Sequence, residues 1–454
     1  MLRLFGPFRH RLWAYPNWFP EPSHVRPVSD QTEAMGRSLS MPKQTPRRVI
    51  EVRQDVVAPT DPRPKARWPK TVGDFPGVAQ VHLEVAKKLA SPLLTGPPLC
   101  DEMVAFVQHL FTEEEASVVR HLGQFVGRSA ADLAKAERRP VEEIAPVLER
   151  LAAGKRAIAA SGPAGRAKYR LMPIMPGIFE MVLIGESPDT LSPWHRRFAE
   201  LFQALYETGY IRDYRQGHTG PSPFVRVLPV GSTIAAHPMA LPSDRLEVIL
   251  DRYTDFGLGQ CQCRMTMQVA GQGCGKPVGN CTVMGEFAAR GIRQGWLRAV
   301  SKKNVLEIKR EAESHGLVTW IMNAEAARGQ ASCSCCGCCC YAMRIVTEFN
   351  APGVMAPAHF RPRFDSARCT YCGQCARQCP VGALAMDVRQ RTSRYLEARC
   401  IGCGLCVVAC GDRRAVAMEP VPAYTLPYQS WFAYQLHATA GMVKSAWKVW
   451  RRRS

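Results

Sequence analysis

At 454 residues and a formal net charge of +20, the chain is too long for one typical hydrophobic core and carries a strong excess of basic residues. We therefore expect two to four domains of roughly 100 to 150 residues each. The positive charge suits nucleic acid, an anionic membrane face or an acidic redox protein, and charge alone does not choose among these partners.

Cysteine is the most informative residue type in the chain. There are 19 cysteines, and all except Cys100 lie between Cys261 and Cys410. Such crowding indicates metal binding rather than ordinary packing. Residues 1–20 mix arginine with proline and lack the continuous apolar segment of an export signal, which argues against a disulfide-rich secreted protein. No apolar run reaches the about 18 residues of a membrane-spanning helix, so we expect a cytoplasmic protein.

Residues 1–75 are rich in proline and arginine. They show no sustained helical or strand periodicity, which predicts an extended, partly disordered arm. Nothing in this arm points to a particular chemistry.

The segment from residue 76 to 176 changes to short amphipathic helices. Thr112 and Ser129 are each placed to begin a helix, and a third helix is predicted from about Val141 to Ala152. Residues 158–171 can then form a hairpin around Gly162. Three helices followed by a small hairpin resemble a winged helix-turn-helix, which implies that the third helix would be the recognition helix if DNA were the ligand.

Residues 177–350 have a mixed α/β pattern and contain ten of the cysteines, so we expect a cysteine-rich middle domain. The predicted helices cover 193–208, 243–256 and 302–313, the first capped by Ser192 and the last by Ser301. The predicted strands cover 224–230 and 317–321. These elements frame the cysteines on either side.

The most specific motif lies within residues 358–420. Four cysteines have the spacing C-x2-C-x2-C-x3-C, and a second run with the same spacing begins 31 residues after the first. The first run is Cys369, Cys372, Cys375 and Cys379, followed by Pro380, and the second run is Cys400, Cys403, Cys406 and Cys410.

These two runs resemble a bacterial-type dicluster ferredoxin, which carries two [4Fe-4S] clusters. In that family each C-x2-C-x2-C loop gives three thiolates to one cluster, and the fourth cysteine of the run crosses over to the other cluster. The resemblance implies that one cluster is bound by Cys369, Cys372, Cys375 and Cys410, and the other by Cys379, Cys400, Cys403 and Cys406. The family usually has proline after both runs, whereas Gly411 follows the second one here, so we expect that loop to leave its cluster differently.

Zinc is the alternative metal, because paired C-x2-C knuckles can form four-thiolate sites. The strict spacing of both runs and the Cys-Pro pair favour iron-sulfur clusters. The apolar segments 383–386 and 415–418 follow the two runs and predict short strands that shield the clusters from water. Positive charge favours the reduced cluster, so the arginines around the loops predict a potential above that of an acidic ferredoxin. These arginines are Arg368, Arg377, Arg399, Arg413 and Arg414.

The ten central cysteines fall into two sequence groups. The first group is Cys261, Cys263, Cys274 and Cys281, and the second is Cys333, Cys335, Cys336, Cys338, Cys339 and Cys340. All four cysteines of the first group can ligate one further iron-sulfur cluster and four of the second group another, or the two groups can share one site. A structural zinc site and a thiol relay are the alternatives.

The arrangement over residues 98–420 resembles a group of iron-sulfur proteins from anaerobes. In that group a winged-helix-like segment precedes a C-x-C-R region, a C-C-x-C-C-type cluster and a terminal ferredoxin. The resemblance implies an α+β, multidomain architecture with a winged-helix-like domain, a mixed α/β cysteine-rich domain and a dicluster ferredoxin fold. It implies no particular reaction.

Other residues and segments outside these groups bear on function. Arg264 can stabilise thiolates or bind an anion, although a lone arginine is more often a surface salt-bridge residue. Cys100 is expected to be a buried, inert thiol. The segment 271–276 lacks the spacing of a phosphate loop, and no dinucleotide-binding motif follows a clear strand, so electrons would have to come from another protein. No catalytic residue is identified.

Residues 421–454 form a basic tail without an acidic residue. Apolar residues recur in it at helical spacing, and the basic residues close the helix. The apolar stripe consists of Phe432, Leu436, Val443, Trp447 and Trp450. It can lie on the inner face of a membrane through residues 425–454, contact an acidic partner, or pack on its own domain.

The leading hypothesis is an iron-sulfur electron-transfer protein that passes electrons to or from an oxidoreductase partner. This hypothesis favours an electron carrier or an oxidoreductase subunit over an enzyme that acts on its own. A redox-responsive DNA-binding regulator is the rival, with positive charge from Arg138, Arg139, Arg150, Lys155 and Arg156. Two intact clusters arranged for internal transfer add nothing obvious to a DNA switch, which favours electron transfer. A reductase with its active site in the central cysteine region is the third hypothesis.

Overall fold

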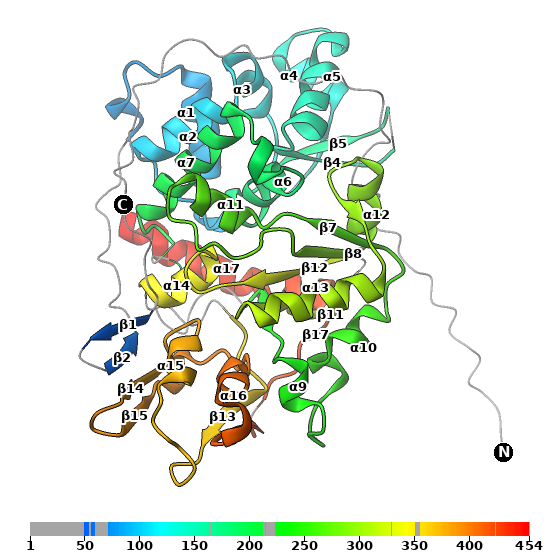
Figure 1. The fold of residues 1–454 in the computed structure, drawn as a ribbon. Helices are drawn as coiled ribbons and strands as arrows, with labels where there is room; N and C mark the ends of the chain where they lie inside the picture. Colours follow the sequence, from blue (N-terminus) through cyan, green and yellow to red (C-terminus); the bar gives the residue numbers. More distant parts are fainter. Residues whose placement is uncertain are drawn as a thin grey trace, which may run out of the picture.

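A six-stranded antiparallel sheet lies at the centre of the fold (Figure 1). The computed structural model describes residues 50–53, 56–59, 71–163, 165–211, 214, 223–327, 329–349, 355–422 and 424–453. The sheet has the order β6-β10-β12-β8-β7-β9. These strands are β6 (Val225–Val227), β10 (Val318–Met322), β12 (Gly329–Cys335), β8 (Cys281–Gly285), β7 (Phe256–Gly259) and β9 (Arg298–Ala299).

Helices cover both faces of this sheet. Neighbouring residues of a strand point to opposite faces, so Val283 and Met284 of β8 mark the two sides. Met284 packs with Val305 of α13 (Lys302–Ser314) and with Leu250 of α10 (Leu246–Leu250). Val283 packs with Ala288 of α12 (Glu286–Arg293). The predicted strands 224–230 and 317–321 and the helix 302–313 thus correspond to β6, β10 and α13.

The helix predicted over residues 243–256 is wrong in length. After a 3-10 turn at Pro242–Asp244, Arg245 has extended backbone and only Leu246–Leu250 are α-helical. Phe256 already begins β7 and pairs with Met284. The tertiary demand for strand pairing therefore overrides the local helical pattern.

The N-terminal half of the described chain is mainly helical. Its helices are α1 (Gln80–Leu89), α2 (Asp101–Leu110), α3 (Glu113–Val119), α4 (Ala130–Glu137), α5 (Val141–Glu149), α6 (Phe179–Leu183) and α7 (Pro193–Glu207). The predicted caps are confirmed, because the side chains of Thr112, Ser129 and Ser192 each accept a backbone hydrogen bond at the start of a helix. The third predicted helix continues beyond Glu149 as a π turn.

A small sheet accompanies these helices. Its strands β3 (Arg128–Ser129), β4 (Ile158–Ser161) and β5 (Lys168–Leu171) have the order β3-β5-β4, so the predicted hairpin over residues 158–171 is present. The chain order in this part is α3, β3, α4, α5, β4 and β5.

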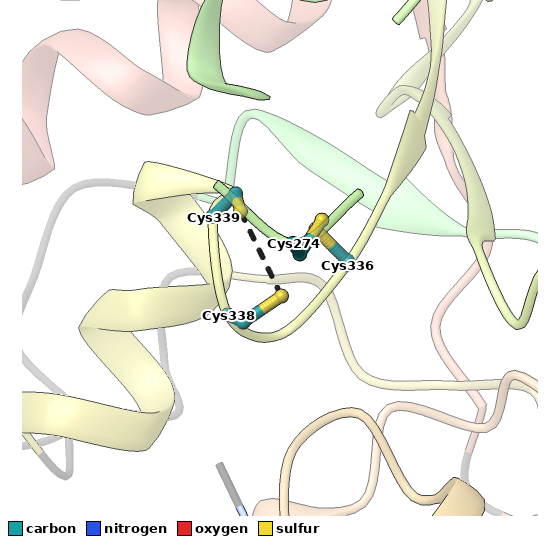
Figure 2. Close-up of side chains that lie close together, drawn as sticks. All are labelled: Cys274, Cys336, Cys338 and Cys339. Atoms are coloured by element: carbon teal, nitrogen blue, oxygen red, sulfur yellow. Dashed lines mark hydrogen bonds between the residues drawn. The ribbon is translucent and has the colours of Figure 1, made fainter. Parts of the chain in front are cut away.

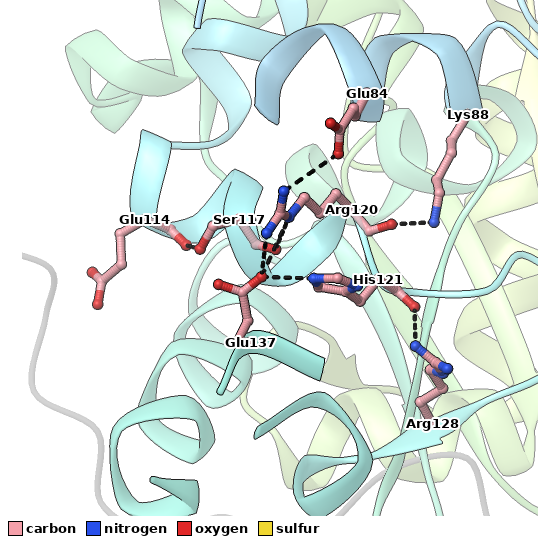
Figure 3. A network of polar contacts seen from close by, with 8 residues as sticks. All are labelled: Glu84, Lys88, Glu114, Ser117, Arg120, His121, Arg128 and Glu137. Carbon is pink, nitrogen blue, oxygen red and sulfur yellow. Dashed lines mark hydrogen bonds and ion pairs between the residues drawn. The ribbon is translucent and has the colours of Figure 1, made fainter. Parts of the chain in front are cut away.

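A network of polar contacts ties α1, α3 and α4 together (Figure 3). Glu137 of α4 accepts hydrogen bonds from Arg120 Nη2 over 3.0 Å and from His121 Nε2 over 2.7 Å. Arg120 also lies 3.6 Å from Glu84 of α1. The network holds the helices in place and uses His121 as a structural residue.

The C-terminal module, residues 358–420, repeats one unit twice. In the first unit α15 (Gln374–Gln378) is followed by β14 (Leu384–Asp387), and in the second α16 (Leu405–Cys410) is followed by β16 (Val416–Pro420). β14 pairs with β15 (Thr392–Tyr395), and β16 pairs with β13 (Phe360–Phe364). The short strands predicted after each cysteine run are confirmed, each beginning one residue later than predicted.

A hairpin from the N-terminal arm extends the sheet of this module, a pairing that the sequence did not predict. Strands β1 (Ile50–Arg53) and β2 (Val56–Pro59) pair with each other, and β2 pairs with β14. Residues 1–49, 54–55 and 60–70 of the predicted disordered arm lie outside the described residues.

The remaining elements join these parts. They are α9 (Gly231–Ile234), α11 (Gln262–Val269), α14 (Tyr341–Phe349), the parallel pair β11 (Ala324–Ala326) and β17 (Tyr428–Ser430), and α17 (Trp431–Arg453). The largest hydrophobic core runs without interruption from α1 through the central sheet into the C-terminal module. Within the described part of the chain, no helix is both long and apolar enough to cross a membrane.

Candidate metal centres

The C-terminal module contains a cavity lined by cysteines from both runs. Cys369, Cys372 and Cys375 of the first run and Cys410 of the second line it. Leu384, Met386 and Val416 contribute apolar walls from β14 and β16. The structure therefore brings together the first quartet that the ferredoxin resemblance implied.

A second cavity in the module is lined by the other four cysteines of the two runs. Cys400, Cys403 and Cys406 of the second run line it together with Cys379 of the first. Leu384 and Tyr395 line both cavities, so the two lie next to each other. Each run thus places three thiols at one cavity and the fourth at its neighbour.

Backbone amides point at sulfur in the same way in both runs. The amides of Tyr371 and Gly402 donate to the first cysteine of their run, Cys369 and Cys400, over 3.4 and 3.5 Å. The last cysteines, Cys379 and Cys410, accept from Ala383 over 3.2 Å and from Ala415 over 3.3 Å. Amide hydrogen bonds of this kind stabilise negative charge on sulfur.

Burial works against ionisation of several of these thiols. It raises the pKa of Cys375 to about 11 and also raises the pKa values of Cys403 and Cys406. A thiolate in such surroundings needs a cation as partner. Bound metal supplies that charge, so the buried thiols suit metal ligands better than free cysteines.

The five arginines predicted to surround the loops have different positions. Arg413 lines the first cavity, together with Arg394 of β15. Arg377 donates to the carbonyl oxygen of Cys372 over 2.7 Å, whereas the buried Arg399 donates to Val381. Arg368 lies 3.5 Å from Asp365, and Arg414 follows the last short helix in left-handed backbone conformation. Arg413 is therefore the predicted arginine that lies at a cavity wall.

The second run leaves its cavity through glycine. Gly411 has φ +57°, a conformation that residues with a Cβ rarely adopt, and begins the short helix Gly411–Arg413. Proline, which requires negative φ, cannot adopt this conformation. The departure from the usual Cys-Pro pattern therefore has a conformational cause.

Four of the central cysteines form a compact group (Figure 2). The sulfur atoms of Cys274, Cys336, Cys338 and Cys339 all lie within 4.8 Å of one another. The separation is 4.0 Å between Cys274 and Cys336, and 3.7 Å between Cys338 and Cys339. The structure thus places Cys274 with the downstream thiols and does not bring together the quartet that sequence grouping suggested for it.

The loop that carries Cys274 contains the glycines that resemble part of a phosphate-loop motif in the sequence. Gly271 and Gly275 both have φ +70°, so glycine is needed on either side of the cysteine. Gly273 packs against Gln268 of α11, where a Cβ would lie 3.2 Å from the Gln268 Cα. These glycines position a thiol and not a phosphate.

The other six central thiols form a second, extended group. Cys281, Cys333 and Cys335 lie on adjacent strands β8 and β12, whereas Cys261 and Cys340 directly precede α11 and α14. Neighbouring thiols of this group interact in the order Cys281, Cys333, Cys335, Cys340, Cys263 and Cys261. Among the described residues, no three of these six sulfur atoms lie within 4.8 Å of one another, so this group is more open than the compact one.

Two buried cations lie beside these groups. Arg264 is only 2% exposed and donates to the Ser334 carbonyl oxygen over 2.7 Å and to the side-chain oxygen of Asn280. Lys309 is equally buried, and burial lowers its pKa to about 8 although nearby thiols favour its charged form. The prediction that Arg264 is a surface residue is wrong, and nothing in the sequence indicated that Lys309 is buried.

The loop between Cys336 and Cys338 touches the C-terminal module. Gly337 packs so closely on Pro380 that a Cβ would lie 1.6 Å from the Pro380 carbonyl oxygen. Pro380 directly follows Cys379, which lines the second cavity. The compact cysteine group and that cavity are therefore joined by a direct backbone contact.

Most of the basic residues considered for DNA contact have acidic partners. Arg139 pairs with Glu143 and Glu114, and Lys155 lies 2.6 Å from Glu115. Arg150 lies 3.5 Å from Glu114, and Arg156 pairs with Glu186.

Cys100, far from the metal centres in sequence, is buried as predicted, and burial raises its pKa to about 12.

Comparison with known proteins gives one match. A family model described as a 4Fe-4S dicluster domain matches residues 361–411, which include both cysteine runs of the C-terminal module. No curated protein and no solved structure matches the chain. Residues 361–411 are thus a ferredoxin-like iron-sulfur domain.

Proposed function

We propose that the chain is an iron-sulfur electron-transfer protein whose C-terminal module holds two [4Fe-4S] clusters. The supporting observation is the pair of adjacent cavities, each lined by three cysteines of one run and one cysteine of the other. The first cluster would be bound by Cys369, Cys372, Cys375 and Cys410, and the second by Cys379, Cys400, Cys403 and Cys406. Single electrons would pass between the clusters and a redox partner.

Transfer between the two clusters needs little from the protein beyond their placement. Leu384 of β14 and Tyr395 of β15 line both cavities, so the proposed clusters would lie next to each other. Arg413 and Arg394 at the first cavity favour the reduced state there. The chain thus offers two adjacent sites through which electrons would pass in sequence.

A reductase with its reaction centre in the middle domain is the second candidate. The contact between Gly337 and Pro380 favours it, because it holds the middle domain, which carries the central cysteines, directly against the second cavity. The six-thiol group would then hold a further iron-sulfur centre. Arg264 and Lys309 would balance its negative charge.

The helical N-terminal part is proposed as a docking adaptor of the winged-helix type. The order α3, β3, α4, α5, β4, β5 supports that fold assignment. The ion pairs of Arg139, Arg150 and Lys155 with glutamates of α3 and α5 reduce the positive charge available for DNA. A protein partner is therefore favoured over DNA.

Residues 425–454 are proposed to contact the surface of an anionic membrane. The stripe predicted from the sequence is more than half exposed along its length, whereas Tyr434, Ala438 and Val449 are buried on the opposite side of α17. Lys444, Lys448 and Arg451 flank the stripe without any acidic residue in the tail. An amphipathic helix with aromatic and basic residues in this arrangement suits an interfacial position.

The test of the proposed clusters is iron and acid-labile sulfide analysis of the full chain purified without oxygen. Two clusters give about eight irons per chain, and about 12 or 16 would mean that central thiols also hold clusters. Cys375→Ser and Cys406→Ser should each remove the signal of one cluster in the electron paramagnetic resonance spectrum of the reduced protein. Cys100→Ser is the matched control and should change neither value. A colourless protein with zinc in both runs would overturn the proposal.

A further inference from the structure

We propose that Cys274, Cys336, Cys338 and Cys339 bind a single zinc ion, separate from the iron-sulfur centres. Three of these thiols lie in one short loop before α14, and the fourth comes from the loop after α11. The ion would therefore cross-link two loops that are 62 residues apart along the chain at Cys274 and Cys336.

The distances between the sulfur atoms indicate one ion and not a cluster. Four thiolates at about 2.3 Å from a tetrahedral zinc ion stand about 3.8 Å from one another. The separations of 4.0 and 3.7 Å, with all four sulfurs within 4.8 Å, match this arrangement. In a cubane each thiolate binds a different iron atom, which holds the sulfurs further apart.

The C-terminal module provides an internal comparison. Among the described residues, no three of its cysteines have sulfurs within 4.8 Å of one another, although they line common cavities. The same chain thus contains two kinds of four-cysteine arrangement. The wide one suits a cubane and the narrow one suits a mononuclear site.

The surroundings of the narrow group also suit zinc. Four thiolates around a divalent ion leave a net charge of −2, which needs compensation in a partly buried site. Arg264 interacts with Cys336, and α11 holds this guanidinium in a buried position. Four protein thiolates leave no open position for substrate, so the site is structural.

The ion would fix the surface on which the C-terminal module rests. Gly337 lies between two of the proposed ligands and contacts Pro380. The loop holds three consecutive cysteines after Gly337, and metal binding would order it. The zinc site would thus set the distance between the middle domain and the second cavity.

The test is metal analysis of the full chain, purified without oxygen, combined with X-ray absorption at the zinc edge. We expect about one zinc per chain and a zinc environment of four sulfurs at about 2.3 Å. Nitrogen or oxygen in the zinc shell, or no zinc at all in protein that carries its full iron content, would overturn the proposal. This measurement needs no variant, so a folding defect cannot confuse it.

A pair of variants then assigns the ligands. Cys274→Ser should lose the zinc, whereas Cys100→Ser should keep it. Cys274→Ser should also keep the resonance signals of the clusters in the C-terminal module, which separates loss of this site from failure of the proposed electron-transfer function. Retention of zinc in Cys274→Ser, or iron in place of zinc at this site, would contradict the inference.

Discussion

Single residues decide the electrostatics around the cysteine groups. Thiols in the interior ionise with difficulty, and burial, aided by the neighbouring thiols, raises the pKa of Cys375 to about 11. Amide hydrogen bonds, arginines and metal must offset that cost. Arg413 at the first cavity and Arg264 beside the central thiols are the side chains best placed to do so.

Arg413→Gln should lower the reduction potential of the first cluster. The arginine lines the cavity, and its positive charge favours the additional electron. The side chain is exposed, so water screens the effect, and we expect a decrease on the order of 20–40 mV, which corresponds to less than about 1 kcal/mol. The midpoint potential is read from a redox titration monitored by electron paramagnetic resonance.

Arg414→Gln is the matched control for this measurement. Arg414 is the next residue and is also exposed, but it does not line the cavity. Its removal should change the potential less than removal of Arg413. An equal or larger change in the control would show that general surface charge, and not the cavity arginine, sets the potential.

Individual elements present faces that the core does not use, and α17 is the clearest case. Its buried side, with Ala438 and Val449, packs the helix onto the protein next to the turn Pro92–Leu94 and β11. Its other side leaves Trp447 51% exposed and Leu436 68% exposed. The helix therefore packs on its own domain, as one alternative predicted, but through the face opposite the stripe.

Replacing Leu436 and Trp447 together by serine should weaken binding to anionic vesicles. Each large apolar side chain contributes about 1.5–3 kcal/mol when it leaves water, so binding should fall at least about tenfold. Co-sedimentation with vesicles of phosphatidylcholine and phosphatidylserine measures it. Met239→Ser, at an exposed apolar residue far from α17 in sequence, is the control and should bind like the unchanged protein. Failure of the unchanged chain to sediment at low salt would favour an acidic protein partner instead.

At the scale of the whole molecule, close backbone contacts hold the middle domain and the C-terminal module together. Gly337 meets Pro380, and a Cβ at Gly404 would lie 2.6 Å from the side chain of Thr233. The amide of Val230 also donates to the carbonyl oxygen of Cys403 over 3.0 Å. These contacts place the second cavity against the central sheet region.

Gly337→Ala should destabilise this interface. The added methyl group would overlap the Pro380 carbonyl oxygen, so backbone must shift, and overpacking of this kind typically costs about 1–3 kcal/mol. Thermal unfolding followed by circular dichroism should show a lower midpoint, with both cluster signals retained. Gly231→Ala is the control, because a Cβ there meets no atom within 4 Å. Equal melting temperatures for the two variants would mean that the contact is not tight in solution.

The sequence by itself determined the features that depend on neighbouring residues. The spacing of the two cysteine runs predicted the C-terminal iron-sulfur module, and the caps at Thr112, Ser129 and Ser192 predicted helix starts, because both depend on residues within a few positions of one another. The periodicity of α17 likewise predicted its stripe. Gly411, in place of the usual proline, likewise predicted that the chain leaves the second cysteine run in a different conformation.

Only the tertiary structure decided how the ten central thiols divide. Cys274 joins Cys336 because the loops after α11 and β12 meet in space, whereas Cys281 joins Cys333 through the register of β8 and β12. Pairing over such separations depends on strand order and register, which local spacing does not encode. The same reason explains why the burial of Arg264 and the exposure of Trp447 emerged only when the chain was folded.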